Sequence, residues 1–243
     1  MSTQISFTVI TIDVGTSITL PIAGVTSVDI YWGDASGSSS TYTSNYPSFT
    51  YDLSGTYIIN LSNCNFTTIN NQNNSSGIGF KNSLSNFSYY NQISSLTSFA
   101  NAFFNVQTDF SLDISSNVTS NVQAMNAMFY GCSNFNHPVL FDTTVCTTFE
   151  NMFVNCTAFN QPVSFDTHSA TTLATMFTNC VIFDSSLNLT DTSSVSDFNN
   201  MFYGCTKFNQ PVPFDTSSAN NFSNMFSGCS AFNLNQYHLM QVA

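Results

Sequence analysis

Five cysteines recur at nearly constant spacing in the C-terminal half of the chain, and they are the residues most able to do chemistry. They are spaced 24, 24, 25 and 24 residues apart, at Cys132, Cys156, Cys180, Cys205 and Cys229. Thiols stacked about 5 Å apart could form disulfides or bind a soft metal. Structural zinc sites normally use close pairs such as CxxC, and the sequence has none. We therefore expect buried, reduced thiols that act as small hydrophobic groups, with no metal and no cofactor.

Four aspartates repeat in the same way and could in principle hold calcium. They are Asp142, Asp166, Asp191 and Asp215, each followed by threonine. Carboxylates about 5 Å apart in water repel by only about 0.8 kcal/mol per neighbour, so their stacking does not require a cation. Asp, Ser and Thr commonly cap helix N-termini. We interpret the four aspartates as helix caps.

The other titratable residues form no catalytic set. His137, His168 and His238 are the only imidazoles, and Glu150 is the only glutamate. A catalytic cysteine needs a nearby base or positive charge, which the repeated cysteines do not have at any fixed spacing. The sequence also has no glycine-rich phosphate loop and no nucleophile elbow. We expect no enzyme.

The charge of the chain argues against two classes of partner. The chain has thirteen acidic residues and only two basic ones, Lys81 and Lys207, which gives a net charge of −11. Without cations to neutralise phosphates, we expect no binding to nucleic acid or to an anionic membrane surface. No apolar run approaches the roughly 18 residues of a membrane span, so we expect no membrane insertion. The N-terminus also has no signal-peptide pattern.

A short repeated unit must position the cysteines. The segment NAMFYGCSNF at 126–135 returns as NMFVNCTAF, TMFTNCVIF, NMFYGCTKF and NMFSGCSAF. Its methionines keep the same spacing, at Met128, Met152, Met176, Met201 and Met225. A period in the twenties predicts a solenoid, in which one coil buries its apolar face only by stacking on its neighbours. Residues 95–110 match as a degenerate first coil, with Phe103 for Met, Phe104 for Phe and Gln107 for Cys.

Within a repeat, two kinds of local structure are expected. Val145, Phe149 and Met152 are spaced as on one helical face, which predicts a short helix in each coil. The Pro-marked segment after each cysteine predicts an extended chain. Two rows should stack there, one of phenylalanines inside and one of amides or acids that bind backbone groups at a bend. The rows are Phe135, Phe159, Phe183, Phe208 and Phe232, and Asn136, Asn160, Asp184, Asn209 and Asn233.

The N-terminal part predicts a different structure. Residues 5–64 alternate apolar and polar residues in short runs between Gly, Ser, Asn and Pro, which is typical of an antiparallel sandwich. The order WGD at 32–34, Tyr51 and GTY at 55–57 resembles the signature of polycystic-kidney-disease (PKD) type immunoglobulin-like domains. Ala35 stands where that family usually has glycine.

The repeat unit, MFxGCxxFNQPVxFDTSS, is similar to that of BspA-like leucine-rich-repeat surface proteins. Together, the resemblances imply a mainly β fold with short helices. They divide the chain into a PKD-like β-sandwich at 1–64, a connecting and N-capping segment at 65–90, and a leucine-rich-repeat-like solenoid of about five to six coils at 91–243. They also imply a location at the cell surface or outside the cell.

Two functions remain open at this stage. The first is a non-enzymatic recognition or adhesion module that binds a protein or a glycan through its solenoid. The alternative is a structural component of a virus particle or another assembly, such as a decoration or minor capsid protein, located at the virion surface. The apolar C-terminal end, 233–243, predicts self-association or docking on a larger assembly, because no polar cap follows the last coil.

Overall fold

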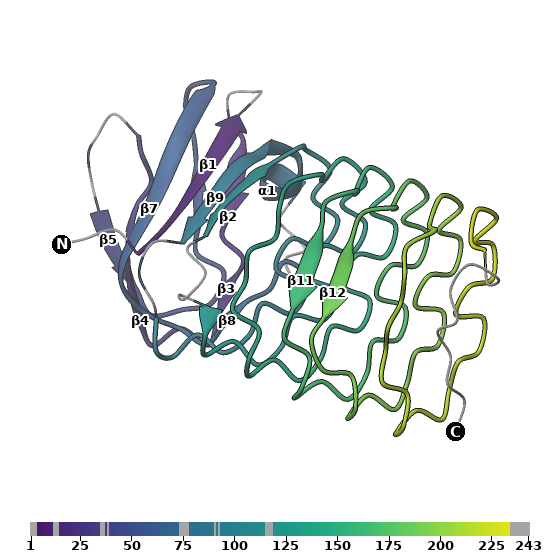
Figure 1. Cartoon of the computed structure of the whole chain (residues 1–243). Helices are drawn as coiled ribbons and strands as arrows, with labels where there is room; N and C mark the ends of the chain where they lie inside the picture. Colours follow the sequence, from purple (N-terminus) through teal and green to yellow (C-terminus); the bar gives the residue numbers. More distant parts are fainter. Residues whose placement is uncertain are drawn as a thin grey trace.

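The computed structural model of the chain describes residues 4–11, 15–34, 37, 39–72, 78–89, 91, 93–114 and 119–233. Within these ranges the protein is mainly β, and its one α-helix is α1 (Ile78–Ser83). Figure 1 shows most strands gathered at the N-terminal end, with the repeats following as a series of turns laid side by side.

A six-stranded sheet dominates the N-terminal end. Its order is β10-β9-β1-β7-β4-β5, with β1 (Ile5–Thr11), β4 (Ser27–Tyr31), β5 (Ser39–Tyr42), β7 (Gly55–Asn65), β9 (Leu84–Tyr89) and β10 (Ser111–Ile114). Neighbours are antiparallel except β9 and β10, which run parallel. Strand β9 comes from the segment expected only to connect and cap, so that segment supplies an inner strand of the sheet.

Four short strands complete this end of the molecule. Strand β2 (Ser17–Thr19) pairs with β6 (Ser48–Thr50), and β3 (Ile22–Ala23) pairs with β8 (Thr68–Ile69). Their buried residues Ile18, Ile22 and Ile69 join the same core as Phe7 and Ile30 of the large sheet. Alternating apolar residues therefore face inward from both sides.

The expected PKD or immunoglobulin-like sandwich at 1–64 is wrong. The strands opposite the large sheet form two separate pairs of two or three residues, and none of the sheets closes. Pro21 lies between β2 and β3, and Pro47 precedes β6. Because proline has no N–H to donate to a ladder, these positions keep the pairs short. The large sheet also takes β9 and β10 from beyond residue 64.

The repeats contact one another through very little regular strand. A single parallel bridge joins each to the next, along the row Thr68, Ser98, Ala124, Thr148, Thr172, Asp197 and Asn221. The one longer pair is β11 (Val163–Phe165) with β12 (Leu187–Leu189).

Backbone amides in the repeats alternate between two roles. The N–H of Phe153 donates to the carbonyl of Met176 in the next repeat at 2.8 Å, whereas the N–H of Val154 donates back to Asn151 in its own turn at 3.3 Å. The equivalent bonds to the next repeat run from Phe103 to Met128, Phe129 to Met152, Phe177 to Met201 and Phe202 to Met225. Every second amide therefore joins two repeats, and the others close tight turns.

Two left-handed positions in each repeat create these turns. One precedes the methionine or its equivalent, at Asn101, Ala127, Asn151, Thr175, Asn200 and Asn224. The other precedes the cysteine or its equivalent, at Asn105, Gly131, Asn155, Asn179, Gly204 and Gly228. All have φ between 52° and 82°. Asparagine and glycine adopt such angles at the lowest cost, which explains their recurrence.

The expected leucine-rich-repeat-type solenoid, with a short helix in each coil, is therefore wrong. A helix needs negative φ at every residue, and two positions four residues apart have positive φ. Val145, expected on the buried helical face, is 39% exposed. The residues 119–233 contain turns and two three-residue strands but no α-helix.

The first repeat also lies in a different register from the one expected. Phe103 stacks on Phe129 at 5.4 Å between ring centroids, so it is equivalent to the repeat phenylalanine and not to methionine. Ala102 then takes the methionine position, and Val106 takes the cysteine position. Phe110 still contacts Phe135, with the rings tilted and their centroids 5.0 Å apart. The interval from Phe103 to Phe110 is one residue longer than that from Phe129 to Phe135.

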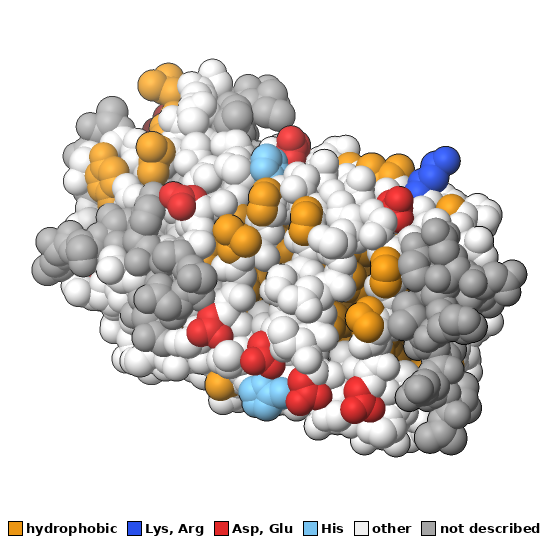
Figure 2. Space-filling view, viewed as in Figure 1, with side chains coloured by type: hydrophobic (Ala, Val, Ile, Leu, Met, Phe, Trp, Pro, Cys, Tyr) orange, Lys and Arg blue, Asp and Glu red, His pale blue; other side chains and the backbone are white. Residues whose placement is uncertain are grey.

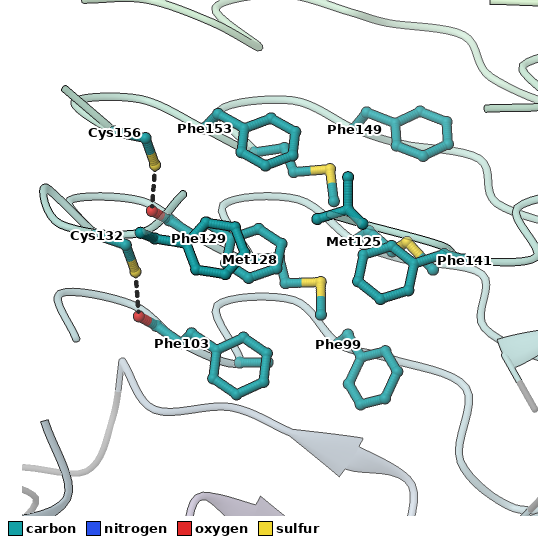
Figure 3. Packing of buried hydrophobic residues seen from close by; sticks show 14 of the residues in the cluster. Phe99, Phe103, Met125, Met128, Phe129, Cys132, Phe141, Phe149, Phe153 and Cys156 are labelled. Atoms are coloured by element: carbon teal, nitrogen blue, oxygen red, sulfur yellow. Dashed lines mark hydrogen bonds between the residues drawn. The ribbon is translucent and has the colours of Figure 1, made fainter. Parts of the chain in front are cut away.

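Columns of aromatic rings fill the interior of the repeats. Phe129, Phe153 and Phe177 stack 5.3 Å apart, with interplanar angles of 4° and 6°. The phenylalanine row expected from the sequence forms a second column and is confirmed. Its ring centroids are 5.7 to 5.9 Å apart from Phe135 to Phe232. Methionines and cysteines flank these columns (Figure 3). The repeats thus share one continuous apolar core.

We predict that Thr175→Asn stabilises the protein by about 1 kcal/mol, because a β-branched residue at positive φ is strained and asparagine is not. Asparagine already occupies this position in the repeats at Asn151, Asn200 and Asn224. Urea unfolding would measure the change. The control is Thr171→Asn, an exposed site outside the left-handed positions, where we expect about 0.5 kcal/mol or less. A loss of stability in Thr175→Asn alone would contradict the role given to this angle.

We predict that Phe177→Ala lowers the free energy of unfolding by about 3–5 kcal/mol, as truncation of a buried aromatic residue does. Its ring stacks on Phe153, Phe183 and Phe202 and has no exposed surface. Tyr203→Ala, at a ring that is 43% exposed, serves as the control and should cost about 1 kcal/mol or less. Equal losses in the two variants would show that the columns do not carry the stability.

Candidate functional site

The cysteine row lies inside the protein, and each thiol binds the preceding repeat. All five side chains are buried and free of disulfides. The Sγ of Cys132 donates to the carbonyl of Phe103 at 2.9 Å, and that of Cys156 donates to Phe129 at 3.0 Å (Figure 3). Cys180, Cys205 and Cys229 make the same bond, to Phe153, Phe177 and Phe202.

Burial makes these thiols poor nucleophiles. Desolvation raises the pKa of Cys156 and Cys180 well above the usual value for cysteine, and raises that of Cys229 to about 11. Since the thiolate is the reactive form, a high pKa opposes both catalysis and metal binding. The five cysteines therefore act as buried, hydrogen-bonded core residues.

The methionine row has the same character. Met128, Met152, Met176 and Met201 are fully buried, and Met225 is 4% exposed. They belong to the same apolar core as the aromatic columns. The five methionines therefore pack neighbouring repeats against one another.

The four aspartates expected to cap helices instead cap turns. The Oδ1 of Asp142 accepts the N–H of Thr144 at 3.1 Å, two residues on, and the equivalent bonds join Asp166 to His168, Asp191 to Ser193 and Asp215 to Ser217. The backbone N–H of His168 lowers the pKa of Asp166, the hydroxyl of Ser193 that of Asp191, and the backbone N–H of Ser217 that of Asp215. The carboxylates thus act locally, within one turn each.

The threonine after each aspartate was missed by the sequence reasoning. Thr143 is 2% exposed, and its hydroxyl donates to the carbonyl of Asp166 at 3.0 Å and accepts the N–H of Asp166 at 2.8 Å. Thr119, Thr167 and Thr192 are buried and donate in the same way to Asp142, Asp191 and Asp215. The available signal was the Asp-Thr pair at 142–143, 166–167 and 191–192, although Thr119 follows a valine.

The expected row of amides and acids at the bend is confirmed. The side-chain oxygen of Asn136 accepts the N–H of Asn160 at 2.9 Å, and that of Asn160 accepts the N–H of Asp184 at 2.8 Å. In the same way, the side-chain oxygen of Asp184 accepts the N–H of Asn209, and that of Asn209 accepts the N–H of Asn233. Each repeat thus satisfies a backbone amide of the next.

One serine, one histidine and one aspartate form a hydrogen-bonded chain on the surface. The Nδ1 of His168 lies 2.8 Å from Asp166 Oδ1, and its Nε2 lies 2.9 Å from the hydroxyl of Ser169. Such a chain can activate a serine when it lies in a site closed to water. Here the side chains of His168 and Asp166 are 53% and 36% exposed, and the Ser169 hydroxyl also contacts the Thr144 carbonyl. The arrangement is that of a solvated turn.

The other titratable residues do not assemble a site. His137 lies 2.9 Å from a carboxylate oxygen of Asp109, and His238 lies outside the described residues. Among the described residues, no group of three or more His, Cys, Asp or Glu side chains could hold a metal ion. No helix in the described part of the chain is long and apolar enough to cross a membrane.

The cavities on the described surface include two that are lined partly by residues of the large sheet. One is a hollow of about 360 Å³ on the large sheet, lined by Asp29, Tyr31, Ser39, Thr41, Asn60, Leu61 and Ser62. The other, of about 160 Å³, lies beside β10 and is lined by Leu112, Ile114, His137, Pro138, Leu140 and Phe141. Figure 2 shows apolar side chains grouped near a histidine on this face, within a surface that is otherwise mostly uncharged.

The fold and surface define a class of protein: tight-turn repeats stacked on a β-sheet module, with no catalytic constellation among the described residues. A family model matches residues 69–165 and 162–242, more than half of the chain. The chain therefore belongs to the family described as "Mycoplasma protein of unknown function, DUF285". No curated protein and no solved structure matches it.

The expected membership of the BspA-like leucine-rich-repeat surface proteins, with a PKD-like domain, is wrong. The comparisons give no support to either family, and the matching model is that of the DUF285 family. The motif MFxGC encodes turns with left-handed asparagine and glycine, as the φ values show, so its likeness to a strand-and-helix repeat was misleading.

We predict that a thiol reagent at neutral pH labels none of the five repeat cysteines rapidly in the folded protein. After unfolding in urea, all seven cysteines should react. Cys229, at 9% exposure the least buried of the row, should be the first to react on prolonged incubation. Mass spectrometry of trapped peptides would read the order. Rapid native labelling of Cys156 or Cys180 would contradict their placement.

We also predict that stability falls as the pH rises above about 9. In the unfolded chain the thiols titrate near 9, whereas burial raises the pKa of Cys146 and Cys229 to about 11. Above pH 9 the unfolded state therefore binds fewer protons than the folded state, which favours unfolding. Urea midpoints at pH 7.5 and 9.5 would measure this, and Cys180→Ala should show a shallower dependence. An unchanged midpoint would contradict the buried thiols.

Proposed function

We propose that this protein is a non-enzymatic recognition module that binds a protein or glycan ligand through the outer surface of its stacked repeats. Rows of uncharged hydroxyls, each held in place by the preceding repeat, support this proposal. Thr157 donates to the Ser133 carbonyl at 3.2 Å, and Thr206 donates to the Val181 carbonyl at 2.9 Å. Both residues are exposed.

Such rows suit recognition for a physical reason. Side chains fixed in one conformation lose less entropy when a ligand arrives than mobile ones do. A chain with two lysines and no arginine must recognise its partner mainly by hydrogen bonds and shape. These properties favour a partner with an uncharged or cationic surface. We propose that the protein meets this partner on the outside of a cell or particle.

The test is a glycan and protein array probed with the full chain and with the double variant Thr157→Glu, Thr206→Glu. We expect a ligand for the full chain and at least a tenfold loss in the variant. Thr8→Glu on the N-terminal sheet is the control. Binding to no ligand on the arrays, or equal binding by the double variant, would contradict the proposal. Ester hydrolysis that is lost in Ser169→Ala would contradict its non-enzymatic part.

A structural role in an assembly is the second candidate, and the end of the last repeat favours it. The amides of Phe222, Asn224, Phe226 and Gly228 are equivalent to those that join earlier repeats, yet they have no acceptor among the described residues. Phe222 and Phe226 are also only partly buried. An open edge of this kind invites pairing with another chain.

The segment 233–243, expected to mediate this docking, lies outside the described residues beyond Asn233. Light scattering on the full chain and on a form ending at Asn233 would test the second candidate. Concentration-dependent association of the full chain would support it. A full-length monomer at high concentration would contradict it, and aggregation of the shortened form alone would identify the tail as a cap.

A further inference from the structure

The hollow on the large sheet is built by two rows of side chains that cross three adjacent strands. One row is Ser39, Tyr31 and Asn60, and the other is Thr41, Asp29 and Ser62. Because alternate residues of a strand share a face, all six side chains stand on the outer face of β5, β4 and β7. The inner face of the same strands carries Val28, Ile30 and Leu61, which are fully buried.

The strand pairing is irregular beside the hollow. The pairing of β4 with β7 shifts in register between Ser27 and Asp29. Such a bulge bends the strand and increases its twist, and bulges often occur beside binding sites. The hollow, of about 360 Å³, falls within the range of small-ligand sites, about 300–1,000 Å³.

The carboxylate at its centre is held in position. Asp29 Oδ1 accepts the hydroxyl of Thr41, and Asp29 Oδ2 accepts the side-chain amide of Asn63, both at 2.5 Å. These two hydrogen bonds lower the pKa of Asp29, and the bond from Thr41 lowers it more than the bond from Asn63 does. The ionised carboxylate keeps further lone pairs for a ligand hydroxyl.

The rest of the lining narrows the class of ligand. Tyr31 is 36% exposed and offers an aromatic face, while Asn60, Ser39 and Ser62 can each donate and accept hydrogen bonds. Among the described residues that line the hollow there is no lysine, arginine or histidine, so an anion would meet only the charge of Asp29 there. In the same described lining, a metal ion would find one carboxylate and no second charged ligand. A neutral, polyhydroxylated ring satisfies both the polar groups and the aromatic face.

We propose that this hollow binds a neutral saccharide, whose hydroxyls bind Asp29 and Asn60 and whose apolar ring face stacks on Tyr31. The site lies on the N-terminal sheet and does not depend on ligand binding by the repeats. Its failure and the failure of the proposed repeat surface are therefore separate results.

The test is an NMR titration of the full chain with methyl glycosides of glucose, galactose and N-acetylglucosamine. We expect at least one to shift the amide signals of β4, β5 and β7, with a Kd of about 1 mM. Tyr31→Ala and Asp29→Asn should each weaken it at least tenfold. Ile58→Ala, on the same face of β7 but outside the hollow, is the matched control and should bind as the unaltered chain does. Melting curves of the variants would verify that they fold.

Three results would overturn the proposal. The first is the absence of shifts at these strands with all three glycosides. The second is binding that Tyr31→Ala and Asp29→Asn leave unchanged. The third is a stronger response of the same signals to glucuronate or spermidine than to any neutral glycoside, which would assign the hollow to a charged ligand.

Discussion

The hydrogen bond from every second amide of one repeat to a carbonyl of the next is the interaction on which the rest of the structure depends. It requires that the intervening amides turn back on their own repeat, and left-handed residues such as Asn151 and Asn155 make those turns. The backbone then advances by one repeat with its phenylalanines in register, and rings 5.3 to 5.6 Å apart stack face to face. The thiols, threonines and asparagines add further bonds between the same pairs of repeats.

Much of the core could be predicted from the sequence, because the spacing of Met, Phe and Cys reveals which positions must be equivalent. The local geometry could not be predicted in the same way. The spacing of Val145, Phe149 and Met152 fits a helix, but a periodicity does not reveal the sign of φ. The better signal was Asn or Gly before each cysteine, since neither favours a helix interior. The Asp-Thr pair was similarly ambiguous, because a turn and a helix N-terminus use the same capping residues.

Of the candidate sites, too, one could be predicted from the sequence and the other could not. The burial of the cysteines follows from their place in an apolar repeat, and a sequence can indicate that. The hollow around Asp29 depends on the pairing of β5, β4 and β7 and on one shift in register, and these arise only when strands distant in sequence meet. Its polar residues look unremarkable in a chain rich in Ser, Thr and Asn. The fold thus buries the thiols in the core and leaves mostly uncharged polar side chains and a few aspartates on the surface.

The most direct test of this account is hydrogen exchange of two equivalent amides. The Phe177 amide donates to the carbonyl of Met201, whereas the Phe226 amide, in the same position of the last repeat, has no acceptor among the described residues. If bonds between repeats hold the structure together, Phe177 should exchange only on global unfolding, and Phe226 at least about 100-fold faster. Equal protection of the two amides, or rapid exchange at Phe177, would contradict the account.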